Sequence, residues 1–260
     1  SFRRDNIPPR PPTDFGLHRG EQVHIGATLW NRGNVLIGIY GQYHNESNDR
    51  RFSTCDLGLV VSNDALHFKE PVPDFQMVPA YEEPHGAPPR LLQGQGFENI
   101  GERSLFWYGL WRGESTHIES GVRVATWPQD RLAHFSPDPS AVQLRHFDAS
   151  EDFESTVEPS HFISCPLELE GNDARVYLNA SGLSEHSFLR VEILTREFEP
   201  IPGLTGDDSV AVTESGFRQL VTWKERESIA ATDLPIRVKV IWDGIRPEDA
   251  RLYAAYVVQT

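Results

Sequence analysis

The sequence predicts an all-β protein, and three observations lead to that prediction. A strand-turn-strand-loop-strand pattern occurs twice in the first half of the chain, short alternating strands fill the second half, and helical periodicity is almost absent. The one helical signal is Pro247-Glu248-Asp249-Ala250, where proline suits the first position of a single turn. We therefore expect β-domains throughout, with one turn of helix at most.

The repeated pattern is the most informative feature of the first half. Its first copy predicts strands at 24–29, 35–43 and 55–61, and its second copy predicts strands at 91–99, 104–111 and 122–127. Tyr40-Gly41 recurs 68 positions later as Tyr108-Gly109, and Asp64 recurs 66 positions later as Asp130. Antiparallel units at a fixed period are typical of β-propeller blades. The alternative is a pair of unrelated hairpin meanders within one sandwich.

The second half predicts a different architecture. Its alternating segments predict six strands, at 162–169, 174–180, 188–194, 219–223, 236–242 and 251–258. Six short strands within about 100 residues, separated by turn clusters, are typical of an antiparallel β-sandwich. A proline-rich and acidic stretch at 136–160 marks the junction. We expect an extended linker at 1–14, propeller blades at 15–145 and a C-terminal β-sandwich at 155–260.

Composition excludes several classes of function. The net charge of −14 argues against nucleic acid, because binding phosphates requires clustered lysine and arginine. No apolar run approaches the ~18 residues that a membrane-spanning helix needs. No metal-ligand spacing, Walker loop or nucleophile elbow is present, so we expect no metal and no cofactor. Cys55 lies in an apolar strand, where a buried free thiol is the default, and nothing in the sequence distinguishes a secreted from a cytoplasmic protein.

Two groups of polar residues are candidates for a binding site. The innermost strand of each propeller blade lines the central funnel, and the long loops between second and third strands carry aromatic, amide and charged groups suited to sugars. The funnel candidates are His24, Arg32, Gln93, Gln95 and Glu98, and the loop candidates are Tyr43, Asp49, Trp111 and Arg112. The alternatives are an ordinary solvated loop and, for Gln93-Gly94-Gln95-Gly96, glycines that only let strands crowd together.

Glu98 is the candidate catalytic residue. Glycoside hydrolysis uses two carboxylates, and a carboxyl group among apolar and amide neighbours has its pKa raised toward that of a general acid. Glu98 has such neighbours in the sequence, and Asp49 and Asp56 are possible partners if a loop brings them inward. The alternative is that Glu98 is an edge-strand carboxylate without a catalytic role.

Several segments together resemble a known family. Residues 57–68, read as Leu-Gly-Leu-Val-Val-Ser-Asn-Asp-Ala-Leu-His-Phe, are similar to a strand end of five-bladed propeller glycosidases, and 121–127 with Asp130 resembles the matching strand of their last blade. The segments at 189–194, 202–204, 221–224, 236–240 and 250–254 are similar to the C-terminal sandwich of those enzymes. The chain thus resembles the last two blades and the sandwich of a glycoside hydrolase family 32-like protein.

The resemblance implies a partial five-bladed-type β-propeller of two blades followed by an antiparallel sandwich. It implies a C-terminal portion or subunit of a hydrolase that cleaves fructoside- or arabinoside-like glycans by two-carboxylate chemistry. The family's three catalytic motifs come from earlier blades and are absent here, so a second chain or an upstream fragment would complete the propeller. The expected partners are a carbohydrate and that second polypeptide, with neither nucleic acid nor membrane. The competing interpretation is a non-catalytic carbohydrate-binding or scaffolding propeller.

Overall fold

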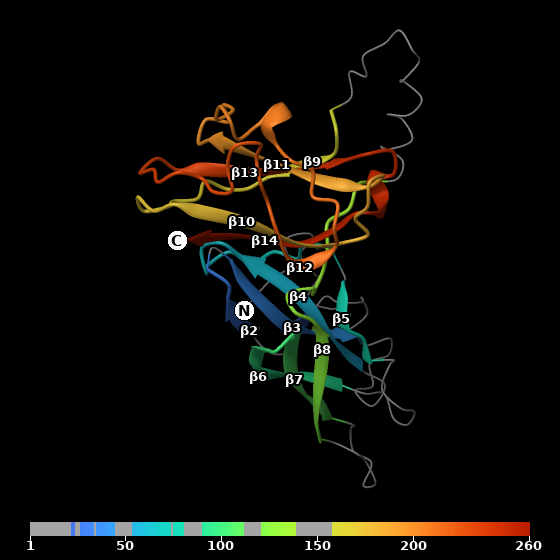
Figure 1. Cartoon of the computed structure of the whole chain (residues 1–260). Helices are drawn as coiled ribbons and strands as arrows, with labels where there is room; N and C mark the ends of the chain where they lie inside the picture. The colour runs from blue at the N-terminus through green and yellow to red at the C-terminus, as the bar shows by residue number, and fades with distance from the viewer. Residues whose placement is uncertain are drawn as a thin grey trace. The chain divides into compact units, whose positions relative to one another are not determined.

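The computed structural model describes residues 22–23, 27–33, 35–44, 54–73, 75–80, 90–111, 121–138 and 158–260, and within them the chain is all-β (Figure 1). The helices that lie wholly within these residues are two short 3-10 turns, η3 (Gly206–Asp208) and η4 (Pro247–Asp249). The second lies where the proline signal predicted one turn, which confirms that prediction. The chain divides into two compact units, Ser1–Gln129 and Asp130–Thr260.

The first unit holds one sheet built from eight strands. They are β1 (Gln22–Val23), β2 (Thr28–Asn31), β3 (Leu36–His44), β4 (Thr54–Ser62), β5 (Gln76–Val78), β6 (Arg90–Ile100), β7 (Arg103–Trp111) and β8 (Gly121–Pro128). Strands β2 to β5 pair antiparallel in chain order, as do β6 to β8, and β1 also pairs with β3. A single parallel pair, Cys55 with Arg90, joins the two sets. We call β2–β5 the first meander and β6–β8 the second meander.

The two meanders repeat one another in register as well as in sequence. Tyr40 lies on β3 and Tyr108 on β7, the second strand of each meander. The turn before each of these strands contains a glycine with positive φ, Gly33 at 89° and Gly101 at 58°, and these glycines are also 68 positions apart. A positive φ favours glycine because it has no Cβ. Five of the six strands predicted for the two copies are present near their predicted bounds. The first was predicted at 24–29, whereas β2 spans Thr28–Asn31, and residues 24–26 lie outside the described residues. Strand β5 was not predicted because three residues carry no periodic signal.

Asp64 closes the turn that follows β4. Its Oδ1 accepts hydrogen bonds from the backbone N–H groups of Leu66 and His67 at 2.9 and 2.7 Å, and its Oδ2 lies 2.7 Å from Nδ1 of His67. The chain then returns to β4 through paired backbone bonds between Val61 and Lys69. Residues 57–68 are therefore the end of β4 followed by a turn that Asp64 holds together.

The second unit contains two three-stranded sheets around one apolar core. Its strands are β9 (His161–Ile163), β10 (Ala174–Ser181), β11 (Phe188–Thr195), β12 (Gly216–Leu220), β13 (Ile236–Asp243) and β14 (Arg251–Gln259). One sheet has the order β12-β10-β14 and the other β11-β13-β9, and both are antiparallel. Each of the four longer strands contributes side chains to a single buried cluster, for example Val176, Val191, Val240 and Leu252. The cluster ties the two sheets of this unit together.

Residues 130–138 belong to the second unit by their contacts. Phe135 forms a backbone bridge with Leu252, and the hydroxyl of Tyr256 donates to Asp130 at 2.7 Å. Nε of Arg131 donates to the buried side chain of Asn179 at 2.9 Å. The sequence predicted blades at 15–145, which include this segment, and residues 139–157 of the junction predicted at 136–160 lie outside the described residues.

Two strands of the second unit required a correction. The sequence predicted a strand at 162–169, whereas β9 ends at Ile163 and Leu167 forms only an isolated bridge with Ile236. It also predicted a strand at 219–223, whereas β12 spans Gly216–Leu220. Beyond it the chain bends so that Trp223 enters the core, where its indole N–H donates to the Val191 carbonyl at 3.0 Å. Its backbone N–H pairs with Arg226 and not with β10. Apolar residues buried in a turn mimic the alternation of a strand, which explains the shifted prediction.

Candidate functional site

A row of paired residues crosses the first unit at one end of its sheet. Tyr43 on β3 pairs with Cys55 on β4, Cys55 pairs with Arg90 on β6, and Arg90 pairs with Trp111 on β7. Two of the predicted site residues, Tyr43 and Trp111, are therefore brought to the same end by the register of the strands. We call this the Arg90 end of the sheet.

Arg90 and Trp111 form the best-defined contact at this end. The guanidinium carbon of Arg90 lies 4.8 Å from the centre of the Trp111 ring, which is a cation–π distance. Arg90 is 7% exposed, whereas Trp111 keeps 47% of its surface exposed. A buried cation thus supports an aromatic ring that is half open to solvent. Such a ring can stack on the apolar face of a sugar while neighbouring charges bind hydroxyls.

Several strands of the first unit begin or end at the Arg90 end, where three long connections start or finish. One connection runs from the end of β3 at His44 to the start of β4 at Thr54, and another runs from the end of β7 at Trp111 to the start of β8 at Gly121. A third runs from the end of β5 at Val78 to the start of β6 at Arg90. At the opposite end, β2 and β3 are joined through residues 32–35 and β6 and β7 through 101–102, and β4 leaves at Ser62 into the connection 63–75, which pairs back on Val61 through Lys69. Binding residues concentrate on long loops that a rigid sheet presents. Three of the long connections thus start or finish at the Arg90 end, which makes it the better candidate for a ligand.

Glu98 and Arg32 lie at the opposite end. Glu98 is exposed on β6, opposite Leu105. The Arg32 guanidinium lies 4.3 Å above the ring of Trp30, which stacks on Phe97 with ring centres 4.8 Å apart. Arg32 therefore packs on an aromatic ladder between the meanders. The assignment of Glu98 as an acid stays a prediction.

Asp56 is not positioned to act with Glu98. Asp56 follows the residue that pairs with Arg90. Arg90 pairs with Trp111 and Glu98 with Leu105, six residues away along β7, which is about 20 Å at the usual rise of a strand. The two-carboxylate mechanisms need roughly 5–9.5 Å. The Asp56 carboxylate accepts hydrogen bonds from Nε2 of Gln76 at 2.7 Å and from the N–H of Ala80 at 2.5 Å. It thereby holds the segment after β5 against β4.

The thiol of Cys55 is buried beneath the same end. Burial raises the pKa of Cys55 to about 12, the charge of Asp56 adds to the rise, and the charge of Arg90 opposes it. Cys55 and Cys165 are both free, so the predicted buried free thiol is confirmed. A thiol held in its protonated form is a poor nucleophile and a poor metal ligand. Cys55 is therefore part of the packing beneath the candidate site.

The remaining predicted residues are described in part or not at all. His24, Asp49 and Arg112 lie outside the described residues. The backbones of Tyr43, Gln93 and Gln95 are placed in β3 and β6, whereas their side chains are not described. Gly94 allows close approach to a neighbouring strand, because a Cβ at that position would lie 2.0 Å from the carbonyl oxygen of Trp107. The β6–β7 register shifts between Gln93 and Gly96 at this point.

Sequence reasoning missed Arg90. The available signal was an arginine directly before Leu91 and Leu92 at the start of an apolar strand, since arginine is rarely buried unless it has a partner. Its neighbour Trp111 was identified, but only as a loop aromatic. Their contact depends on the antiparallel pairing of β6 with β7, which local sequence does not reveal.

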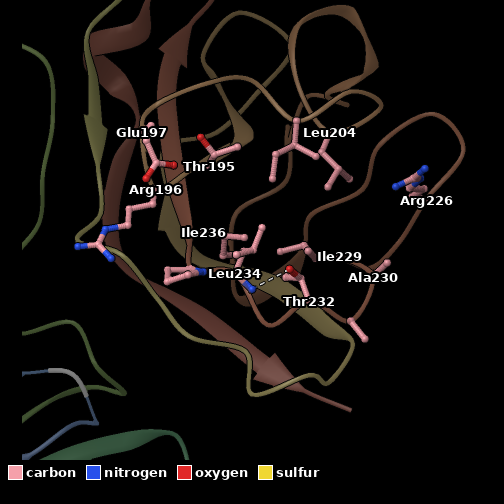
Figure 2. A pocket seen from close by; sticks show the side chains of 13 residues that line it. Thr195, Arg196, Glu197, Leu204, Arg226, Ile229, Ala230, Thr232, Leu234 and Ile236 are labelled. Carbon is pink, nitrogen blue, oxygen red and sulfur yellow. Dashed lines mark hydrogen bonds between the residues drawn. The ribbon is translucent and has the colours of Figure 1, made fainter.

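The second unit contains a pocket of about 450 Å³ (Figure 2). Its wall is mainly aliphatic, including Leu204, Ile229 and Ile236, and Figure 2 shows Arg226 on one side with Arg196 and Glu197 on the other. No aromatic ring lines it. Stacking on a sugar requires such a ring, so this pocket is a poorer carbohydrate site than the Arg90 end.

Other kinds of site find no support within the part of the chain that the structure describes. These residues contain no group of three or more histidine, cysteine, aspartate or glutamate side chains that could hold a metal ion. Their helices are all too short to cross a bilayer. In comparisons with known proteins, no protein-family model matches the chain and no curated protein matches it.

Proposed function

We propose that the first unit is two blades of a five-bladed-type β-propeller and the second unit an antiparallel β-sandwich. The first meander has the four antiparallel strands of a complete blade, and the second meander has three. The first strands of the two meanders are neighbours, since the Thr28 hydroxyl donates to the Gly94 carbonyl and Trp30 stacks on Phe97. Adjacent inner strands from successive units are the arrangement that a propeller requires.

On this fold, the chain is the C-terminal portion or subunit of a glycoside hydrolase acting on furanoside-type glycans. The observation that carries the proposal is the buried Arg90 beneath the half-exposed Trp111, at the end of the sheet where the strands that flank three long connections begin or end. This chain would supply a sugar-positioning wall, with Trp111 stacking on the ring and Arg90 holding the indole in place. Most of the catalytic carboxylates would come from outside the chain.

Binding of furanoside oligosaccharides tests this proposal. Titration of the protein with fructo- and arabino-oligosaccharides, followed by calorimetry, should show saturable binding that Trp111→Ala weakens about tenfold or more, because stacking contributes roughly 1–3 kcal/mol. Ile100→Ala is the matched control, since Ile100 is an exposed apolar residue at the opposite end of β6. Absence of binding, or equal affinity of Trp111→Ala and wild type, would refute the assignment of the Arg90 end.

A non-catalytic carbohydrate-binding protein is the second candidate. It is favoured by the separation of Glu98 from Asp56 and by the engagement of Asp56 in holding the chain after β5. The two candidates differ in the effect of Glu98→Gln on hydrolysis by the complete assembly. The enzyme hypothesis with Glu98 as acid expects a loss of at least about a hundredfold. Unchanged hydrolysis would remove Glu98 from the mechanism.

A further inference from the structure

The pocket of the second unit lies between two connections that leave the same end of one sheet. The first connection, residues 195–204, follows β11, and the second, residues 226–236, leads into β13. Thr195 at the end of β11 pairs with Ile236 at the start of β13, so the two connections begin side by side. The whole pocket therefore belongs to the second unit, and its two walls come from separate segments that the sheet brings together (Figure 2).

The inner wall of the pocket is part of the apolar core. Leu204, Ile229 and Ile236 line the pocket, are each 2% exposed and belong to the buried cluster of the second unit. Leu234 lines the same pocket but is 75% exposed, which places it at the mouth. The pocket thus presents apolar side chains from the core to its rim. Concave apolar surface of this kind is typical of a ligand site.

The two threonines of the wall hold its turns in place. Oγ1 of Thr195 accepts a hydrogen bond from the N–H of Glu199 at 3.1 Å, which closes a turn of the first connection. Oγ1 of Thr232 accepts one from the N–H of Leu234 at 3.0 Å, which closes a turn of the second (Figure 2). Both walls are therefore shaped by bonds within their own connection. The pocket is formed before any ligand enters it, which reduces the entropic cost of binding.

Charged groups lie at the rim of the pocket. The charged residues that line it are Arg196, Glu197 and Arg226, and all three are exposed. Arg196 and Glu197 are neighbours on one side, and Arg226 lies on the other (Figure 2). A Cβ at Gly203 would lie 3.8 Å from the guanidinium carbon of Arg226, so this arginine reaches across to the first connection. The rim therefore carries two positive charges and one negative charge.

Arg226 is available to a ligand. The salt bridges of residues 158–260 join other side chains, and none of them includes Arg226. Glu225 and Glu227 are its neighbours in the chain, but neither of them lines the pocket. A guanidinium presents a planar fork of donors that matches the two oxygens of a carboxylate.

We propose that this pocket binds a straight-chain aliphatic carboxylate, with the alkyl chain against the aliphatic wall and the carboxylate at Arg226. Its volume of about 450 Å³ lies within the range of small-molecule sites. It has room for roughly fifteen groups of the volume that a water molecule occupies in the liquid. An alkyl cation would meet two guanidinium groups against one carboxylate. The site is independent of the carbohydrate binding proposed for the first unit.

Titration calorimetry of the full chain with hexanoate, octanoate, decanoate and dodecanoate, each below its micelle concentration, tests the alkyl chain. Each added methylene group should tighten binding at least about twofold, and about fourfold where its burial is complete. Hydrogen exchange should slow in residues 195–204 and 226–236 when decanoate is added. Absence of saturable binding, an affinity that does not depend on chain length, or protection confined to other segments would overturn the proposal.

Comparison of three eight-carbon ligands tests the head group. Octanoate should bind at least about fivefold more tightly than octanol or octyltrimethylammonium, because only the carboxylate pairs with Arg226. Arg226→Gln should weaken octanoate about fivefold and leave octanol unchanged. Arg175→Gln, at an exposed arginine of β10 outside the pocket, is the control for lost charge. Equal affinity for the three ligands, or an equal effect of the two arginine variants, would contradict a carboxylate site at Arg226.

A substitution at the mouth tests the location of the alkyl chain. Leu234→Ala should weaken decanoate about threefold or more without unfolding the protein, because this leucine is largely exposed. Ile245→Ala is the matched control, since Ile245 is 62% exposed in the same unit and does not line the pocket. If Ile245→Ala weakens decanoate as much as Leu234→Ala does, the chain does not bind in this pocket.

Discussion

The two units of this protein bury different kinds of side chain. Among the described residues of the first unit, the buried groups include a carboxylate, Asp56, and a guanidinium, Arg90. The buried polar groups of the second unit are neutral: Asn179, Ser187 and Ser209. Burying a charge costs free energy unless it is hydrogen-bonded or paired, so charges are retained where position matters more than stability. This difference is one reason why we propose that the first unit carries the function and that the second supports it.

The largest expected effect concerns the two thiols, one in each unit. Cys55 is buried with its pKa raised to about 12, whereas Cys165 is exposed. At pH 8 a disulfide reagent should label Cys165 on the order of a thousandfold faster than Cys55, because the thiolate is the nucleophile and Cys55 is both protonated and covered. Stopped-flow labelling of Cys165→Ser isolates the slow thiol. Equal rates for the two cysteines would mean that the core of the first unit opens freely.

Substitution within the core of the second unit should give the next largest effect. Trp223 is fully buried and hydrogen-bonded to Val191, so Trp223→Ala should lower the stability of the second unit by about 3–5 kcal/mol. Hydrogen exchange followed by mass spectrometry should show the loss in β10, β11 and β13. Leu234→Ala, at an exposed position, serves as the control and should change little. A loss confined to the first unit would contradict the separation of the cores.

A charge-removing substitution tests the first unit. Asp56→Asn keeps the shape but replaces one acceptor oxygen by a donor, which should leave Gln76 or Ala80 without its hydrogen bond and cost about 1–3 kcal/mol. Faster hydrogen exchange is expected in β4 and β5. Asp207→Asn, at an exposed turn of the second unit, should have no such effect. An equally stable Asp56→Asn protein would show that the buried charge contributes nothing to this packing.

The smallest expected effects are pH-dependent and differ between the units. In the second unit, burial lowers the pKa of His134, and the charge of Arg251 adds to the effect. The stability that depends on neutral His134 is therefore present above about pH 6.5 and is lost as the pH falls toward the folded-state pKa. In the first unit, the hydrogen bonds from His67 and Leu66 hold the pKa of Asp64 well below its usual range, so its contribution is lost only below about pH 3.9.

Hydrogen exchange at several pH values measures these two responses separately. Residues near His134 should become less protected first as the solution is acidified, and the turn at Asp64 later. His134→Gln and Asp64→Asn cannot titrate in these ranges and should each remove the corresponding response. A first unit that responds at pH 6 and a second that responds only below pH 4 would reverse the comparison and contradict both assignments.

Local sequence patterns were sufficient to predict most of the strands. The alternation in Arg190-Val191-Glu192-Ile193 predicted which side chains of β11 are buried, and the structure places Val191 and Ile193 in the core. The recurrence of Tyr40 at Tyr108 predicted two equivalent meanders, which the registers of β3 and β7 support. These predictions succeed because the period of a strand and the conformation of a glycine turn depend on neighbours in the chain.

The location of the candidate site was decided by the tertiary structure. The sequence could list Arg32, Glu98, Tyr43 and Trp111 as polar or aromatic residues beside predicted strands, but it could not tell that the first two lie at one end of the sheet and the last two at the other. It also gave no reason to select Arg90, whose role depends on its pairing with Cys55 and Trp111. Residue types and their periodicity are local properties of the sequence. Strand register, and therefore which residues meet at one end or one face of the sheet, depends on contacts between distant segments.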